Sequence, residues 1–251
     1  MSRRPVRAMI VLSALCVFSG AGWIVVAQQP ELPGSSRSAS KKIDLDRFEK
    51  QVRDFEEADK ANPPHPGSIV FTGSSSVRHW HKNLAKDFEG LAVLGRGFGG
   101  STMPELFHFM DRLVVPYKPR AVVVYEGDND LNAGITVEEL LEDYRKFHKR
   151  LQRKVPGCRL FVLAIKPSPS REKVWDQAQE ANTRLAQWCK SETNVTFIDV
   201  ATPMLNEAGK PRPELFLRDR LHMTREGYAV WLKAIEPHLA RFATPESAQL
   251  R

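Results

Sequence analysis

Cysteine is scarce in this chain, and long runs of basic residues are absent. Two of the three cysteines, Cys158 and Cys189, lie outside the apolar N-terminal run. They form one disulfide or remain free, partly buried thiols, because sequence alone does not place their Cα atoms within bridging distance. The formal charge is +7, and three arginines in the first seven residues leave +4 for the rest. This mild, dispersed excess gives no support for a nucleic-acid partner.

The one long hydrophobic run lies at the N-terminus. The basic stretch MSRRPVR precedes twenty uncharged residues, 8–27. This pattern predicts that residues 1–27 are either a signal peptide, cleaved before Gln28, or a membrane anchor. Residues 28–42 are rich in proline, serine and glycine and are expected to form a disordered linker. Both alternatives place the folded part outside the cytoplasm: periplasmic, secreted or membrane-anchored.

Beyond residue 42, strand and helix patterns alternate, and no internal repeat is visible. Buried strands are indicated at 68–72, 91–95, 121–126, 159–165 and 194–200. Helical spacing of apolar residues occurs at 45–55, 103–114 and 140–151, over about 172–190, and after Thr224. Five apolar strands separated by helices favour a doubly wound parallel sheet with helices on both faces. We therefore predict one α/β domain over residues 43–245.

Unusual segments follow the strands, where a parallel sheet gathers its functional groups. They are GSSS (73–76), GRGFGGST (95–102), GDND (127–130) and, late in the chain, FLRDRLHMTREGY (216–228). The second lacks the Lys-Ser/Thr ending of a phosphate-binding P-loop. The third lacks the ligand periodicity that calcium requires. Their joint occurrence at strand ends therefore indicates one shared crevice, whose function is neither P-loop phosphate binding nor calcium binding.

These segments contain every group that ester hydrolysis needs. A serine of the triplet is a weak nucleophile unless a base takes its proton, and His222 is the candidate base. Asp219, three residues earlier, can hold the other imidazole nitrogen and stabilise the imidazolium. Backbone N–H groups of a glycine turn and the Asn129 amide can donate to an oxyanion. The residues alone thus predict a serine hydrolase without choosing the serine.

At this point the sequence resembles the SGNH (GDSL) hydrolase family, over nearly all of residues 67–235. Its four motif blocks occur here in the family's order. The resemblance implies that Ser75 is the nucleophile, with Asp219 and His222 completing a triad. It implies an oxyanion hole formed by Ser75, Gly100 and Asn129. It also implies a flavodoxin-like three-layer α/β/α sandwich of about five parallel strands, with no metal or organic cofactor.

Some residues keep more than one interpretation. Ser74 stands where the family has aspartate, which puts the local hydrogen bonding in doubt, and Ser76 is a less favoured nucleophile. His79 and His81 form either a metal pair or, as we favour, rings that pack beside the serine turn or face solvent.

Lys166 and Arg171 follow the fourth strand. They either attract an anionic substrate or, as we favour, are exposed charges on a rigid proline-containing loop.

The resulting prediction is an exported serine esterase that cleaves short acyl groups through an acyl-serine intermediate. Acetylated carbohydrate or cell-envelope lipid is the expected substrate, and no long apolar lid segment is visible to accommodate long acyl chains. An O-acyltransferase using the same site is the first alternative. A non-catalytic surface binding module is the second, and motifs alone do not choose the substrate.

Overall fold

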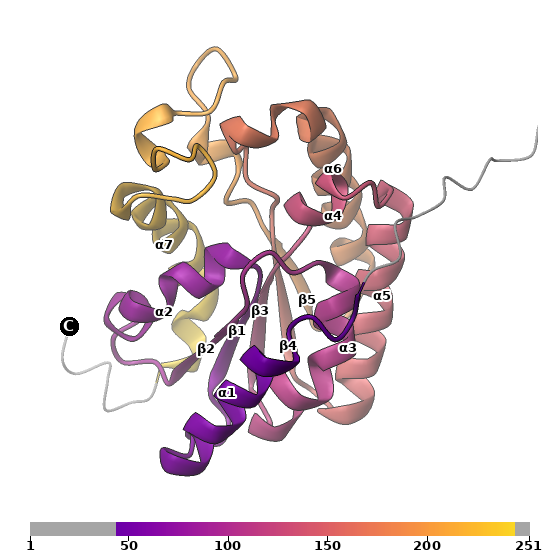
Figure 1. The fold of residues 1–251 in the computed structure, drawn as a ribbon, viewed down its shortest axis with the longest axis vertical. Coiled ribbons are helices and arrows are strands. Elements are labelled where there is room, and N and C mark those ends of the chain that lie inside the picture. The colour runs from indigo at the N-terminus through magenta and orange to yellow at the C-terminus, as the bar shows by residue number, and fades with distance from the viewer. Residues whose placement is uncertain (1–43, 244–251) are drawn as a thin grey trace, which may run out of the picture. The chain divides into compact units, whose positions relative to one another are not determined.

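A five-stranded parallel sheet forms the centre of the computed structural model, which describes residues 44–243 (Figure 1). The strand order is β2-β1-β3-β4-β5. The strands are β1 (Ile69–Gly73), β2 (Val93–Gly97), β3 (Ala121–Tyr125), β4 (Arg159–Leu163) and β5 (Val195–Ile198). Every neighbouring pair is parallel, with Ile69 of β1 in register with Val93 and Ala121. All five predicted strands are present, and the order is that of flavodoxin-like folds.

Helices cover both faces of this sheet. They are α1 (Glu49–Ala61), α2 (Ser75–Asp87), α3 (Met103–Leu113), α4 (Asp128–Asn132), α5 (Val137–Lys154), α6 (Trp175–Ser191) and α7 (Arg225–Leu239). One apolar core joins the sheet to α1, α3, α5 and α6, and a second joins it to α2 and α7. The predicted three-layer α/β/α sandwich is therefore confirmed.

Alternation along the strands explains the two cores. Val122 and Val124 of β3 belong to the first core, whereas Val123 and Tyr125 belong to the second, and all four are fully buried. Successive side chains of a strand point to opposite faces, so a strand covered on both sides must be apolar throughout. This is why AVVVY reads as an unbroken hydrophobic run.

The helix ends follow their local sequence. Thr136 caps α5 by accepting a hydrogen bond from the Glu139 N–H, and the Glu139 carboxylate accepts one from the Thr136 N–H. The pair forms a capping box. Thr224 caps α7 in the same manner, accepting from the Gly227 N–H. Leu45, assigned to the first predicted helix, lies instead in a turn before α1 and is 36% exposed.

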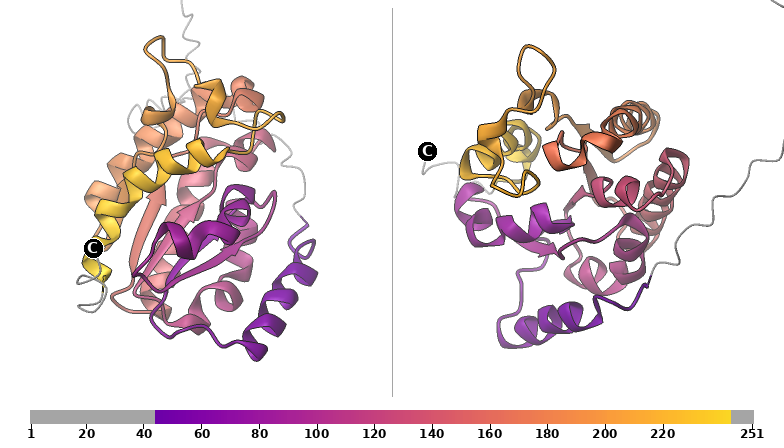
Figure 2. Two further views of the ribbon diagram at one scale, coloured as in Figure 1. Left: turned by 90° about the vertical axis from the view of Figure 1, so that its left-hand side faces the viewer. Right: turned by 45° about the horizontal axis from the view of Figure 1, so that its top comes forward.

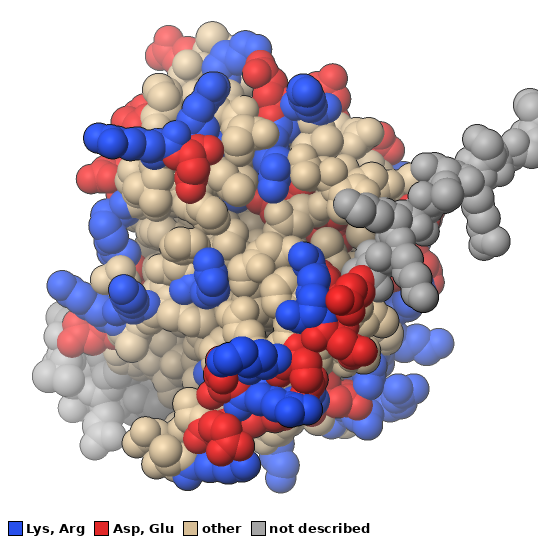
Figure 3. All heavy atoms as spheres, viewed as in Figure 1, with Lys and Arg blue, Asp and Glu red and all other residues tan. Residues whose placement is uncertain are grey.

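Ion pairs attach α1 to its neighbours. Arg112 of α3 contacts Glu49 and Glu56 of α1 at 2.6 Å each, and Asp59 pairs with Arg96 of β2. Figure 3 shows acidic and basic side chains intermingled over this part of the surface.

The two cysteines of the described residues are not bonded to each other. Cys158 and Cys189 are free and buried in the first core, so the disulfide alternative is wrong. Burial raises the pKa of each thiol to about 12.

The predicted signal peptide or anchor (1–27) and linker (28–42) lie outside the described residues. Within residues 44–243, no helix is both long and apolar enough to span a membrane.

Candidate active site

The turn between β1 and α2 presents Ser75 at the first position of a helix. Gly73 ends β1 with φ +119°, and a Cβ there would lie 2.1 Å from the Tyr125 carbonyl oxygen. Only glycine permits this close approach. Ser74 then donates its N–H to the same carbonyl at 3.1 Å, and α2 begins at Ser75. The first N–H groups of a helix have no intrahelical partner, so this turn favours developing negative charge.

His222 lies against this serine, although 147 residues separate them in the chain. Its Nε2 is 3.0 Å from Ser75 Oγ, and its Nδ1 is 2.6 Å from Asp219 Oδ2. Because the ionised aspartate only accepts, Nδ1 carries the proton and Nε2 is left to accept the Ser75 hydroxyl hydrogen. The structure thus joins Ser75, His222 and Asp219 in one chain of hydrogen bonds.

A tight loop before α7 holds Asp219 in place. Its Oδ1 accepts the backbone N–H groups of Leu221 and His222, each at 3.0 Å. Arg220 between them adopts φ +57°. Burial alone would raise the pKa of Asp219, but the hydrogen bonds from the His222 ring and these two N–H groups outweigh it and lower the pKa to about 2. The carboxylate therefore stays ionised at any pH near neutrality.

The other two serines of the triplet are interior. Ser76 is 2% exposed, and its carbonyl accepts the Tyr228 hydroxyl at 2.8 Å. His222 contacts the hydroxyl of Ser75, the favoured candidate, and not that of Ser76. Ser74 is fully buried, and within the described residues its Oγ has no hydrogen-bond partner. The serine that replaces the family's aspartate therefore supplies no side-chain cap to α2.

Two expected oxyanion donors meet at the ends of β2 and β3. Asn129 of α4 donates its Nδ2 to the Ser101 carbonyl at 3.0 Å, next to Gly100. One amide hydrogen then remains for an oxyanion. Gly100 has φ +81°. In the same loop, Phe98 donates its N–H to the carbonyl oxygen of Gly73 at 2.8 Å. The loop thus lies beside the β1–α2 turn.

Arg171 and Lys166 occupy different environments. Arg171 donates from Nη2 to Asn129 Oδ1 at 3.2 Å, so it touches an expected oxyanion donor. Lys166 is 1% exposed and donates to Asp128 Oδ2 at 2.7 Å and to the Tyr125 hydroxyl at 3.0 Å. Neither the substrate-facing nor the exposed alternative holds for Lys166. A long apolar stem and a buried carboxylate partner draw it inward.

The two histidines of α2 face different partners. The His79 ring packs against His222 with centroids 4.4 Å apart and planes inclined by 40°. Burial, and then the proximity of His222, lowers the pKa of His79. His81 accepts the Gly97 N–H at 3.0 Å, and burial lowers its pKa to about 4. The metal-pair alternative is therefore wrong. Among the described residues, no group of three potential ligand side chains could hold a metal ion.

Beneath these loops lies a group of buried carboxyls that the motifs did not reveal. Glu126 directly follows β3 and accepts a hydrogen bond from the Ser101 hydroxyl. Burial, then the nearby Asp130, raises the pKa of Glu126 well above its usual value. Asp130 accepts the N–H groups of Met103 and Gly127 at 2.7 and 3.0 Å. Burial raises its pKa to about 7 despite these bonds.

Helices α2 and α4 were not predicted from the sequence. For α2 a signal existed: Val77, Trp80 and Leu84 have helical spacing and are all buried in the second core. Helix α4 has five residues and is too short for a periodic pattern. The contact of Arg171 with Asn129 has no sequence signal, because 42 residues separate them.

Comparison with known proteins decides the family. The model of the GDSL-like Lipase/Acylhydrolase family matches residues 62–230, which include Ser75, Gly100, Asn129, Asp219 and His222. The chain belongs to this family. The protein is therefore a carboxylic ester hydrolase that acts on small-molecule esters, as the motifs predicted.

Individual relatives of this GDSL-like hydrolase are distant. Platelet-activating factor acetylhydrolase IB subunit alpha1 of Bos taurus is 26% identical over 190 residues, covering 72% of this chain and 78% of the relative. A solved structure from Streptococcus pneumonia, described as a platelet activating factor, has a TM-score of 0.69 at 22% identity. The match covers 78% of this chain and 94% of that chain. A mutant of an acetylxylan esterase from Geobacillus stearothermophilus has a TM-score of 0.56 at 13% identity. The match covers 70% of this chain and 95% of that chain.

Proposed function

We propose that the protein removes short acyl groups from a carbohydrate or cell-envelope lipid ester through an acyl-Ser75 intermediate. The observation that carries this proposal is the hydrogen-bonded chain from Ser75 Oγ through His222 to Asp219. Two similar proteins, the bovine acetylhydrolase and the acetylxylan esterase, have names that specify acetyl groups, which supports a short acyl chain.

The geometry leads to a two-stage reaction. In the first stage, Ser75 Oγ attacks the ester carbonyl carbon while His222 Nε2 takes the hydroxyl proton. The imidazolium, stabilised by Asp219, then gives this proton to the departing alkoxide, and an acyl-serine ester and a free alcohol result. In the second stage, His222 takes a proton from water while the water oxygen attacks the acyl carbon. The imidazolium then returns this proton to Ser75 Oγ as the bond between Oγ and the acyl carbon breaks, and the carboxylic acid is released.

The negative charge of each tetrahedral intermediate requires donors already in place. We assign these to the N–H groups of Ser75 and Gly100 and to the Asn129 amide hydrogen that Ser101 does not use. Preorganised donors of this kind account for about 10²–10³ in rate each.

Replacement of the nucleophile tests this function. Ser75→Ala is expected to lower kcat for ethyl acetate and p-nitrophenyl acetate by about 10³ or more, with an unchanged melting temperature. Ser76→Ala is the matched control and should retain activity. A fluorophosphonate should label the wild type and Ser76→Ala, but not Ser75→Ala. Undiminished turnover by Ser75→Ala would refute the assignment.

Product analysis separates hydrolysis from acyl transfer. Acetic acid should remain the product when an alcohol or sugar acceptor is added, because water resolves the acyl-serine. Predominant formation of a new ester would favour the O-acyltransferase alternative. The non-catalytic binding module has no support from a site in which base and nucleophile are already hydrogen-bonded.

We also propose that the enzyme works outside the cytoplasm. The support is the sequence of residues 1–27 alone, a basic stretch followed by an uncharged apolar run. Fractionation of cells expressing the full chain and a variant lacking residues 1–27 tests it. Activity should leave the cytoplasm only with the full chain, and N-terminal sequencing distinguishes cleavage before Gln28 from membrane anchoring.

A further inference from the structure

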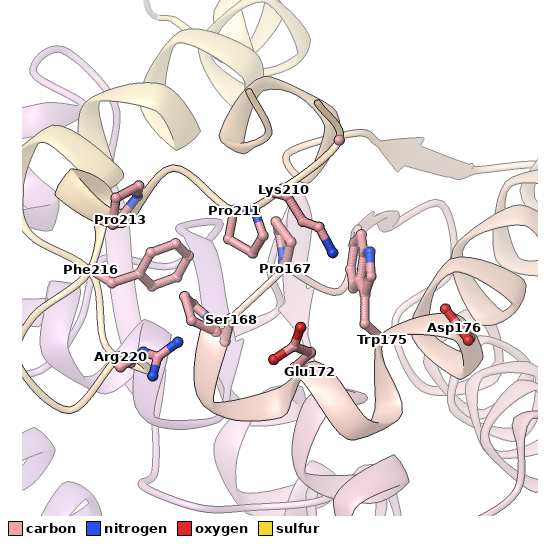
Figure 4. Close-up of a pocket in the computed structure, with 12 residues that line it drawn as sticks. Pro167, Ser168, Glu172, Trp175, Asp176, Lys210, Pro211, Pro213, Phe216 and Arg220 are labelled. Atoms are coloured by element: carbon pink, nitrogen blue, oxygen red, sulfur yellow. The ribbon is translucent and has the colours of Figure 1, made fainter. Parts of the chain in front are cut away.

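A pocket of about 490 Å³ lies between two loops (Figure 4). One wall comes from the loop after β4 and the start of α6, and includes Ser168 and Trp175. The other comes from the segment before His222, and includes Phe216 and Arg220. Figure 2 shows both segments above the same edge of the sheet. The volume lies within the ~300–1,000 Å³ typical of small-ligand sites.

Chain connections place this pocket beside the reacting groups. Arg220 directly follows Asp219, and its carbonyl accepts the Ser170 N–H at 3.0 Å, which joins the two walls. On the opposite wall, Arg171 lies between lining residues and contacts Asn129. The pocket is therefore bordered by Arg220, the chain neighbour of Asp219, and by the segment of Arg171, which contacts the expected oxyanion donor Asn129.

The direction of proton transfer determines which part of a substrate enters. His222 must give its proton to the oxygen of the departing alcohol, so that alcohol lies on the His222 side of the carbonyl. The wall from Phe216 to Arg220 belongs to the same segment as Asp219, the partner of His222. This favours the alcohol portion of the ester over its acyl group as the occupant of the pocket.

The lining has flat apolar surfaces. Figure 4 shows the rings of Phe216 and Trp175 at opposite ends, with Pro211 and Pro167 between them. Phe216 is buried and Trp175 is half-buried. Planar surfaces of this kind stack on the C–H face of a sugar ring, which keeps its hydroxyl groups at the perimeter.

A buried hydroxyl argues against a purely apolar occupant. Ser168 lines the pocket and is 3% exposed, yet within the described residues its Oγ has no hydrogen-bond partner. An alkyl chain packed against this oxygen would leave it unsatisfied, at a cost of about 1–3 kcal/mol. A hydroxyl-bearing ligand would satisfy it.

The charged residues at the pocket balance one another. Lys210 and Arg220 are opposed by Glu172 and Asp176, and none of these four side chains has an ion pair or hydrogen bond within the described chain. This balance favours a neutral occupant with many hydroxyls over an anionic headgroup, which would be matched by an excess of cations.

From these observations, and resting on the proposed function, we infer that the pocket binds the neutral pyranose ring that carries the ester. Trp175 stacks on the ring and Ser168 hydrogen-bonds one of its hydroxyls. The enzyme is accordingly a carbohydrate esterase, with the sugar as its leaving group.

Substrates that differ in one half only test this inference. Methyl 2-O-acetyl-glucopyranoside and ethyl acetate share the acyl group, whereas ethyl hexanoate and ethyl acetate share the alcohol. Trp175→Ala should lower kcat/KM for the sugar acetate about tenfold, chiefly through KM, and leave both ethyl esters within about twofold. Trp175→Phe, which keeps an aromatic face, should restore most of the loss.

Ser168→Ala provides an independent readout. It should lower kcat/KM for the sugar acetate severalfold without lowering the melting temperature, because it removes a hydroxyl that no described protein group uses. Ser170→Ala, in the same loop but exposed and outside the lining, is the matched control and should have no effect. A lower melting temperature with unchanged sugar activity would make Ser168 structural and contradict the inference.

Other outcomes overturn the inference directly. Equal losses on all three esters in Trp175→Ala would indicate a general effect on the site, and a loss confined to ethyl hexanoate would make this an acyl pocket. Unchanged kcat/KM for the sugar acetate would remove the role of Trp175. An inactive wild type would refute the proposed function instead.

Binding then tests the pocket without turnover. Saturation-transfer NMR with methyl glucoside and the Ser75→Ala protein should show contact that Trp175→Ala abolishes in the same background. Contact that persists without the indole, or no contact in either protein, would contradict the sugar site.

Discussion

Arg171 is a residue whose importance depends on one contact. Its guanidinium donates to the oxygen of the Asn129 amide, while the amide nitrogen donates to Ser101. Two partners of opposite type fix the amide plane, so its remaining hydrogen keeps one direction. We therefore regard Arg171 as a positioning residue that acts through Asn129.

Arg171→Ala is expected to lower kcat for ethyl acetate about tenfold with little change in KM, because a misaligned donor weakens stabilisation only in the transition state. Lys173→Ala, an exposed basic neighbour, is the matched control and should match the wild type.

A double-mutant cycle distinguishes positioning from an independent role. Asn129→Ala combined with Arg171→Ala should be no slower than Asn129→Ala alone, because the residue through which Arg171 acts is already absent. Multiplicative losses in the double variant would contradict this prediction.

At the scale of elements, the β1–α2 junction determines where Ser75 lies. Gly73→Ala would place a Cβ against the Tyr125 carbonyl at a backbone conformation that side chains rarely adopt. We expect it to lower the free energy of unfolding by about 2 kcal/mol or more, and to reduce activity by displacing the serine.

Urea denaturation measures this effect, with Gly157→Ala as the control. Gly157 has φ +79°, and a Cβ there would lie in open space. Its replacement by alanine therefore measures the backbone strain alone, and should lower the free energy of unfolding by about 1–2 kcal/mol. Equal costs at the two glycines would mean that the close approach to β3 is unimportant.

Local patterns predicted those elements that are long or buried on both faces. All five strands were found, with ends displaced by a few residues. The three inner strands β1, β3 and β4 are apolar runs because both of their faces are covered, whereas the edge strands β2 and β5 are only partly buried. Helix α4 was not, because its five residues are held by contacts such as those of Asp130 with the N–H groups of Met103 and Gly127. The predicted extension of the first helix to Leu45 failed because spacing alone does not mark where a helix begins.

At the scale of the whole molecule, buried carboxyls link stability to pH. Glu126 is fully buried, and its pKa is raised well above 4.5, so the folded protein keeps a proton that the unfolded chain releases. The unfolded state then binds fewer protons, and stability falls as the pH rises above about 4.5. Asp130, with its pKa raised to about 7, contributes with the same sign.

Glu126→Gln should therefore be more stable than the wild type at pH 8, by about 1 kcal/mol or more, and nearly equal to it at pH 4. Thermal denaturation from pH 4 to 8 measures the difference. Glu89→Gln, at an exposed acid that follows α2 and has no side-chain ion pair within the described residues, should leave the pH dependence almost unchanged. A Glu126→Gln protein that is no more stable at pH 8 would contradict the prediction.

The sequence by itself determined the α/β class, the family and the residue types available for catalysis, because periodicity and short motifs are local properties. The tertiary structure decided that Lys166 is buried against Asp128, that Arg171 contacts Asn129, and that the ring of His79 packs against that of His222. It also created the pocket between Trp175 and Phe216. Such contacts join segments far apart in the chain, and only packing around the sheet fixes their distances.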